Sequence, residues 1–171
     1  MPNRFVAVAV AALSLAACAT DLEPPAQPSF YRSLASAGAQ LDAAAAASMI
    51  SGYRQNNNLD AVAIDPDLMR LADEQARTMA ARDKIEHNVS KDFKARIKAS
   101  GFDVKVAAEN VSAGYHTLAE AFSGWRDSPP HRTNMLLKGA TRMGIAAVYA
   151  PNSKYKVFWT LILAAPDEKR G

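Results

Sequence analysis

The chain has 171 residues, 49% of them hydrophobic and 22% charged, and its formal net charge is +3. This size and composition are typical of one globular domain with additional segments. The basic residues are spread along the sequence rather than clustered, which argues against nucleic acid as a partner. Cys18 is the only cysteine, so no internal disulfide can form and a hydrophobic core must hold the domain together.

The first 17 residues have the pattern of a signal peptide. Arg4 is the only charged residue before Asp21, and an unbroken run of apolar and small residues extends from Phe5 to Ala17. A basic start, an apolar stretch and then small residues are typical of a secretory signal. The run is shorter than the roughly 20 residues that a membrane-spanning helix needs. We therefore predict a signal peptide over residues 1–17.

The end of this run, Leu15-Ala16-Ala17-Cys18, resembles the bacterial lipobox, in which the cysteine becomes the acylated first residue of the mature protein. The alternative is ordinary cleavage nearby, which would leave an unexplained free thiol in an exported protein. We expect Cys18 to carry the lipid, palmitate included, and to anchor the exported protein to a membrane of the bacterial cell envelope. Ala19, rather than aspartate, would permit outer-membrane sorting in a Gram-negative cell, on the periplasmic side or the surface.

Residues 18–36 are predicted to form a tether between this anchor and the domain. They include Pro24, Pro25 and Pro28 and show little apolar periodicity, as in extended linkers. Plain disorder without a function is the alternative. We place the domain at residues 37–165 and a short tail at residues 166–171.

Three helices are expected in the first half of the domain. An alanine-rich helix runs from Ala39 to about Gln55. A second opens at Asp65-Pro66, an N-cap followed by proline at the first helical position, and fades near Arg82. Its apolar residues recur with a 3.6-residue period, and its end places His87 on a loop. A third, short helix is expected from a cap at Ser90 to Gly101.

Strands dominate the second half. A strand from Val104 to about Val111 would place Glu109 at or near its end. Thr117 and Glu120 form a capping box that opens a helix through Trp125, followed by a turn that carries His131. Two β-rich runs, at 143–150 and 155–164, flank a turn and predict a hairpin. The second run is apolar on both faces, which indicates a central strand covered on both sides, in a sheet between helical layers.

Five segments in this order resemble the CAP superfamily, which comprises cysteine-rich secretory proteins, antigen 5 and plant pathogenesis-related proteins. The similarity is to its disulfide-free bacterial branch and covers about residues 40–164. The segments are Ile50–Arg54, the helix from Asp65 that leads to His87, Ala108-Glu109-Asn110, Trp125 with Ser128-Pro129-Pro130-His131-Arg132 and Asn134, and Met143-Gly144-Ile145 with Phe158-Trp159-Thr160. The resemblance implies an α+β fold, a three-layer α-β-α sandwich of the CAP (SCP) type with an open cleft.

The resemblance also implies a site. In eukaryotic members the cleft holds two histidines and two acidic residues, which can take a divalent metal. His87, Glu109 and His131 match three of these positions, while the fourth has no clear match, because Ser128 stands there beside Asp127. Two imidazoles and one carboxylate form a ligand set that suits zinc at an open site. We therefore expect the three residues to share a ligand or metal cleft, with Zn²⁺ or another divalent cation as the possible cofactor.

Other roles for these residues stay open. Glu109 alone could anchor neighbouring backbone N–H groups, and His131 could fix the turn that carries it. Asn110 and Asn134 are interpreted as supporting hydrogen-bonding residues. Ser128 lies three residues before His131, which would suit a nucleophile and its base, but no nucleophile elbow or orienting acid accompanies the pair.

Three classes of function are compatible with this pattern. The favoured one is an anchored binding module for a lipid-like or other small ligand. The second is a hydrolase of the esterase or protease kind, in which a metal-bound or histidine-activated water attacks an ester or amide. The third is a structural or interaction protein of the cell envelope. Whether the protein is an enzyme is left open at this stage.

Overall fold

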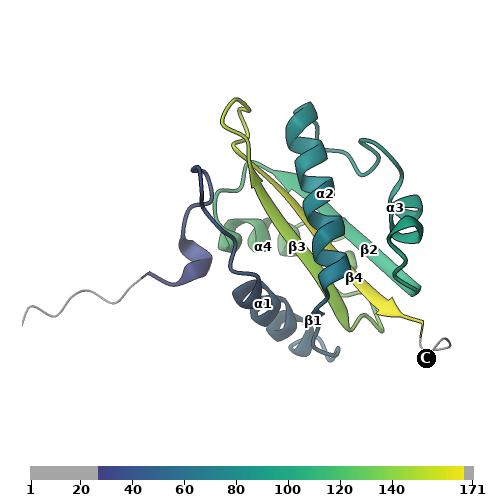
Figure 1. The fold of residues 1–171 in the computed structure, drawn as a ribbon. Helices are drawn as coiled ribbons and strands as arrows, with labels where there is room; N and C mark the ends of the chain where they lie inside the picture. Colours follow the sequence, from purple (N-terminus) through teal and green to yellow (C-terminus); the bar gives the residue numbers. More distant parts are fainter. Residues whose placement is uncertain (1–26, 168–171) are drawn as a thin grey trace, which may run out of the picture.

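The computed structural model describes residues 27–167, and the predicted signal peptide, Cys18 and the end of the tail lie outside this range. It is the predicted mixed α+β sandwich, a four-stranded sheet between two layers of helices (Figure 1). In chain order the elements are η1 Ser29–Tyr31, α1 Ala43–Gln55, β1 Ala63–Ile64, α2 Pro66–Arg82, α3 Phe93–Ser100, β2 Val104–Ala113, α4 Leu118–Asp127, α5 Pro129–Met135, β3 Arg142–Tyr149 and β4 Val157–Pro166.

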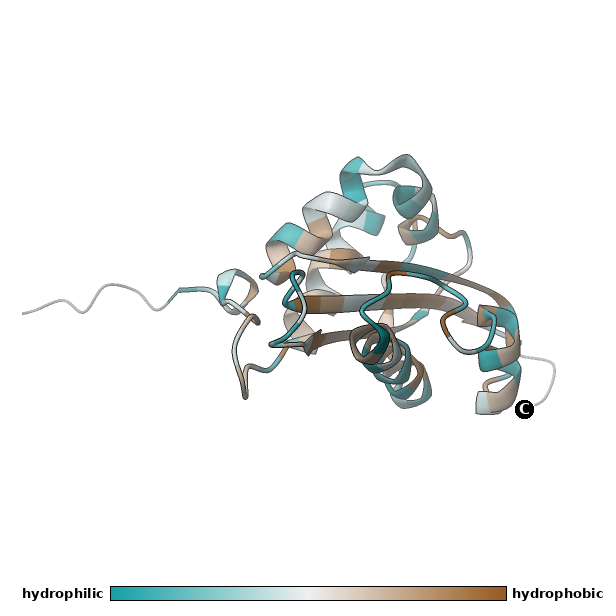
Figure 2. Ribbon diagram, turned by 90° about the horizontal axis from the view of Figure 1, so that it is seen from above, coloured by the Kyte–Doolittle hydropathy of each residue, from teal (hydrophilic) through white to brown (hydrophobic). Residues whose placement is uncertain are grey.

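The predicted central strand is confirmed as β4. The sheet order is β1-β3-β4-β2, and β4 pairs antiparallel with both β3 and β2. Because side chains alternate across a strand, Trp159 and Leu161 contact the core under α1, α4 and α5, whereas Ile162 packs under α2 and α3. Figure 2 shows the sheet edge-on between these two layers. An unbroken apolar run is what such burial on both faces requires.

The helix α2 packs very closely on the sheet at Gly144 of β3. A side-chain Cβ at this position would overlap the backbone of Leu68 in α2. Glycine therefore allows the helix backbone to approach the strand directly, which fixes where α2 crosses the sheet.

Two predicted helix openings are confirmed. The Asp65 side chain accepts hydrogen bonds from the N–H groups of Asp67 and Leu68 at the start of α2. Thr117 and Glu120 form the expected capping box at the start of α4. These signals are reliable because a cap satisfies backbone N–H groups within four residues of itself.

Three helix predictions were wrong in detail. The first helix begins at Ala43 rather than Ala39, because Asp42 caps it by accepting the Ala45 N–H. The cap of α3 is Asp92 and not Ser90, since Asp92 directly precedes the first helical residue and accepts the Ala95 N–H. The expected turn around His131 is a short helix, α5.

The residues Ser128-Pro129-Pro130 explain this last difference. Both prolines lie in the first turn of α5, where the fixed φ of proline suits a helix and its missing N–H is not needed. The carbonyl of Ser128 accepts the N–H of Arg132, which closes the first helical turn.

The described part of the predicted tether belongs to the folded unit. Phe30 packs against the main core, and Leu34 is only 7% exposed within it. The Leu34 N–H donates to the carbonyl of His116 at 2.7 Å. The prolines suggested an extended linker, but these two apolar side chains cover the core, so packing extends to residues before the predicted boundary at residue 37. No helix within residues 27–167 is long and apolar enough to cross a membrane.

Candidate functional site

The site is organised by β2, and Glu109 lies within this strand rather than at its end. The strand continues to Ala113, because its pairing with β4 extends to Ala113 opposite Phe158. Glu109 pairs with Ile162 and therefore faces the α2 and α3 layer, whereas Asn110 pairs with Leu161 and faces the opposite layer. Neighbouring residues of one motif thus serve two different sides of the sheet.

His87 and Glu109 meet, as the family resemblance implies. The Nδ1 atom of His87 lies 2.9 Å from Oε1 of Glu109, and the two side chains are 48% and 1% exposed. A carboxylate can only accept, so Nδ1 is the donor and Nε2 remains available as an acceptor. A buried carboxylate that orients a half-exposed imidazole is an arrangement that can hold a proton acceptor in place.

A residue that the sequence analysis missed completes this cluster. Arg96 of α3 donates from Nη2 to both carboxylate oxygens of Glu109, at 2.8 Å each. The same nitrogen donates to the carbonyl of His87, at 3.2 Å. The sequence held one signal for a buried arginine here. Arg96 lies next to Ile97 and three residues after Phe93, on the apolar side of a short helix.

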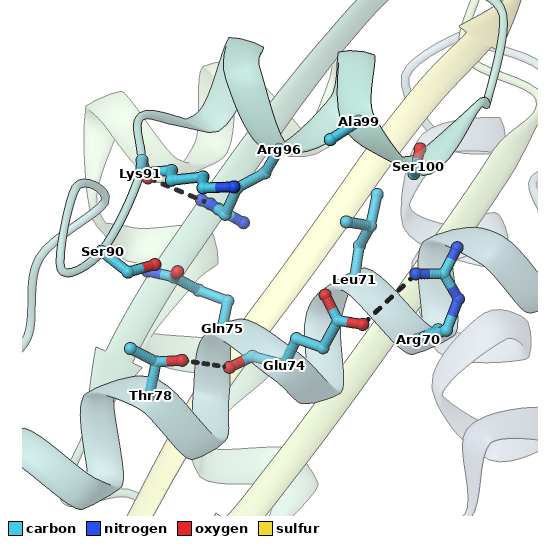
Figure 3. Close-up of a pocket in the computed structure, with 10 residues that line it drawn as sticks. All are labelled: Arg70, Leu71, Glu74, Gln75, Thr78, Ser90, Lys91, Arg96, Ala99 and Ser100. Atoms are coloured by element: carbon cyan, nitrogen blue, oxygen red, sulfur yellow. Dashed lines mark hydrogen bonds and ion pairs between the residues drawn. The ribbon is translucent and has the colours of Figure 1, made fainter.

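Gln75 holds the loop that carries His87. It is the polar member of the apolar stripe of α2, and its Nε2 donates to the carbonyls of Glu86 and His87, at 2.8 and 3.3 Å. Gln75 from α2 and Arg96 from α3 both line a pocket of about 340 Å³ between the two helices (Figure 3). The histidine loop is therefore fixed by buried polar side chains from two helices.

On the other face, two asparagines tie α5 to the sheet. The Nδ2 of Asn110 donates to the carbonyl of His131 at 3.0 Å. The Nδ2 of Asn134 donates to the carbonyl of Glu109 and to Oδ1 of Asn110, at 3.0 and 2.9 Å. The hydrogen-bonding role expected for both residues is thus visible in the geometry.

His131 is placed near His87 but does not join the His87–Glu109 pair. Burial lowers the pKa of His131 below its usual value, and an electrostatic interaction with His87 lowers it further. The two imidazoles are thus close enough to interact electrostatically. Ser128 precedes α5 as its N-cap residue without a side-chain capping bond, and no hydrogen bond joins it to His131 among the described residues.

The arrangement does not fit the expected three-ligand metal site. Within residues 27–167, no three His, Cys, Asp or Glu side chains are grouped closely enough to hold a metal ion. The carboxylate of Glu109 is already bound by a guanidinium on both oxygens. The Glu109 side chain is also only 1% exposed, which leaves a zinc ion little access to the lone pairs that these bonds do not use.

An α-β-α sandwich in which a glutamate on an edge strand pairs with a loop histidine, with a second histidine on a short neighbouring helix, is the arrangement of a domain of the SCP type. The family model for CAP, the cysteine-rich secretory protein family, matches residues 47–163, and the chain belongs to this family.

Individual relatives are distant. The uncharacterized protein YkwD of Bacillus subtilis is 27% identical over 103 residues, which cover 58% of this chain and 40% of that protein. An extracellular protein containing a SCP domain from Bacillus anthracis has 21% identity and a TM-score of 0.62, over 71% of this chain and 39% of that one. An outer surface protein from Borrelia burgdorferi has 19% identity and a TM-score of 0.67, over 74% and 93%.

The chain therefore spans less than half the length of the first two relatives. At these identities the solved structures show the fold alone.

Proposed function

We propose that this CAP-domain protein is a lipid-anchored component of the bacterial cell envelope that binds an anionic amphiphile, such as a fatty acid. The observation that carries the ligand class is an open groove of about 930 Å³ between α3 and the first half of β2. This volume lies in the range of ligand sites for small molecules, about 300–1,000 Å³. The groove is a better supported ligand site than the His87–Glu109 pair, which is largely satisfied by internal bonds.

The lining of the groove matches an amphiphile in two parts. Its apolar residues include Phe93, Ile97, Phe102 and Val104, and its lysines are Lys94, Lys98 and Lys105, with Asp103 as the acidic residue. An alkyl chain on the apolar part would gain about 0.8 kcal/mol for each CH₂ group buried. The ammonium groups would then bind a carboxylate or phosphate head group.

Charge reversal at the rim tests this assignment. Calorimetric titration with decanoate, below its micelle concentration, should show about tenfold weaker binding to the Lys98→Glu/Lys105→Glu variant, because two attractive contacts become repulsive. Binding of uncharged decan-1-ol should change little. The matched control is Lys84→Glu/Lys138→Glu, which alters the charge equally outside the groove lining. Equal decanoate affinities for all three proteins would overturn the proposed ligand class.

The anchor is supported by Leu15-Ala16-Ala17-Cys18, the only cysteine being at the lipobox position. A location in the cell envelope also agrees with the similar fold of an outer surface protein from Borrelia burgdorferi. Stable attachment needs more than one acyl chain, which a lipidated N-terminal cysteine supplies.

We expect Cys18→Ser to release the protein from the membrane fraction or to leave it unprocessed. The measurement is cell fractionation together with the intact mass of the purified protein. If the variant fractionates with the membrane as wild type does, and its mass differs from that of wild type only by the substitution itself, lipid anchoring at Cys18 is contradicted.

A further inference from the structure

We propose that Arg96 is a built-in cation that takes the place of a metal ion beside His87 and Glu109 and keeps this cleft free of divalent metal. The inference does not depend on the amphiphile groove, whose lysines Lys94 and Lys98 lie on the opposite side of α3 from Arg96.

Both oxygens of Glu109 are committed to internal partners. Arg96 Nη2 donates to Oε1 and Oε2 at 2.8 Å, and His87 Nδ1 donates to Oε1 at 2.9 Å. The carboxylate is 1% exposed, so it has no water-facing side from which an ion could approach. The negative charge that would attract a metal is therefore neutralised within the fold.

The guanidinium is also fixed in place. Arg96 is only 8% exposed and lies over the ring of Phe93, with 5.3 Å between Cζ and the ring centroid. Its Nε donates to the carbonyl of Lys91 at 3.3 Å, and its Nη2 reaches the carbonyl of His87. An arginine held by contacts on several sides is not a surface side chain that can swing away to admit an ion.

The two cations would exclude each other. Zinc binds carboxylate oxygen at about 2.0–2.2 Å, which would bring it close to the guanidinium that contacts the same oxygens. Water screens such repulsion only weakly at a buried carboxylate. The orientation of His87 adds to this, because its Nδ1 is used by Glu109 and only Nε2 is left as a possible ligand atom.

Arg96 instead performs the structural task that a bound metal could perform. It connects the backbone of the histidine loop, at His87 and Lys91, to the buried carboxylate on β2. Removing its side chain would leave Glu109 as an uncompensated buried anion next to an imidazole. That pair is expected to accept a divalent cation where the native cleft does not.

The test measures zinc binding by the purified full chain as wild type, Arg96→Ala, Arg96→Lys and the double variant Arg96→Ala/His87→Ala. Calorimetric titration with zinc chloride is combined with thermal unfolding in zinc and in EDTA. We expect wild type and Arg96→Lys to unfold at the same temperature in both solutions. Arg96→Ala should be less stable in EDTA, should regain stability in zinc, and should bind zinc at least tenfold more tightly than wild type. The double variant should lose this gain.

Three results would overturn the proposal. The first is that wild type binds zinc and the Glu109→Gln variant binds it at least tenfold more weakly, since the native carboxylate would then be a metal ligand. Another is an Arg96→Lys variant that binds zinc as tightly as Arg96→Ala, since charge would not be the excluding factor. The third is a folded Arg96→Ala variant with no gain in zinc affinity. If Arg96→Ala does not fold, Arg96→Gln replaces it, and the same comparison applies.

Discussion

Replacement of Trp159 by alanine is expected to lower the free energy of unfolding by about 3–5 kcal/mol, the usual range for removal of a fully buried large aromatic side chain. Trp159 is 0% exposed near the start of β4, the central strand of the sheet. Its ring meets that of Trp125 edge to face, with 6.2 Å between centroids. Its Nε1 donates to the carbonyl of Tyr115 at 2.8 Å, so the substitution leaves both a cavity and an unpaired carbonyl.

Urea unfolding followed by far-UV circular dichroism measures this loss without relying on tryptophan fluorescence. Trp159→Phe is the matched variant, because it keeps much of the ring volume and removes the N–H donor. It should cost less than the alanine substitution. A loss below about 1 kcal/mol for Trp159→Ala would show that the ring is not part of the main core.

Arg54→Met is the second change with a large expected effect. Arg54, on α1, is 1% exposed and binds four backbone carbonyls instead of a carboxylate. Its donors reach the carbonyls of Asp60, Met135, Leu137 and Ala140 at 2.8–3.0 Å. Three of these bonds connect the first helix to the end of α5 and the segment that joins it to β3, and the fourth holds the loop before β1. Burial lowers the pKa of the Arg54 guanidinium, but at neutral pH it keeps its charge.

Methionine would fill part of the volume but would leave these carbonyls without their donors. Because hydrogen bonds to a charged group are each worth about 1.5–3 kcal/mol and do not add fully, we expect a loss of about 3–5 kcal/mol in unfolding free energy. Arg54→Lys should recover only part of it, since one ammonium cannot reproduce the planar fork.

The control for Arg54 is Arg77→Met on α2, which removes a highly exposed guanidinium paired with Asp73. Surface ion pairs of this kind contribute between zero and about 1 kcal/mol. Similar losses for Arg54→Met and Arg77→Met in chemical denaturation would contradict a structural role for the buried arginine.

The contact between Arg96 and Glu109 distinguishes this cleft from one defined by the family's site residues alone. His87, Glu109 and His131 match the family's cleft positions, and His87 and Glu109 are in contact. However, α3 contributes the Arg96 guanidinium, which is not part of the family motif. Matching residues at matching positions therefore do not by themselves define the chemistry of the cleft. We propose that the Arg96 charge, which faces them from α3, decides whether the cleft takes a metal.

Local signals in the sequence were sufficient for several elements. The caps at Asp65 and Thr117 act on backbone groups within one helical turn, so they can be interpreted without knowledge of the rest of the fold. The apolar run of β4 predicted a strand buried on both faces, because burial of both sides leaves no alternation in the sequence. The contact between His87 and Glu109 came only through the family resemblance, since no local spacing joins residues from a loop and a distant strand.

Only the tertiary structure decided the rest. The pairing of β2 with β4 determines that Glu109 and Asn110 face opposite layers, and a shift of one residue would exchange them. The packing of α3 against the same face brings Arg96 to Glu109, although nothing in the sequence of α3 specifies which carboxylate it meets. Likewise, Phe30 and Leu34 are part of the core because α1 and α4 leave apolar surface for them to cover. Periodicity and caps act within one element, whereas the charge balance of this cleft arises from contacts between elements that only the folded chain brings together.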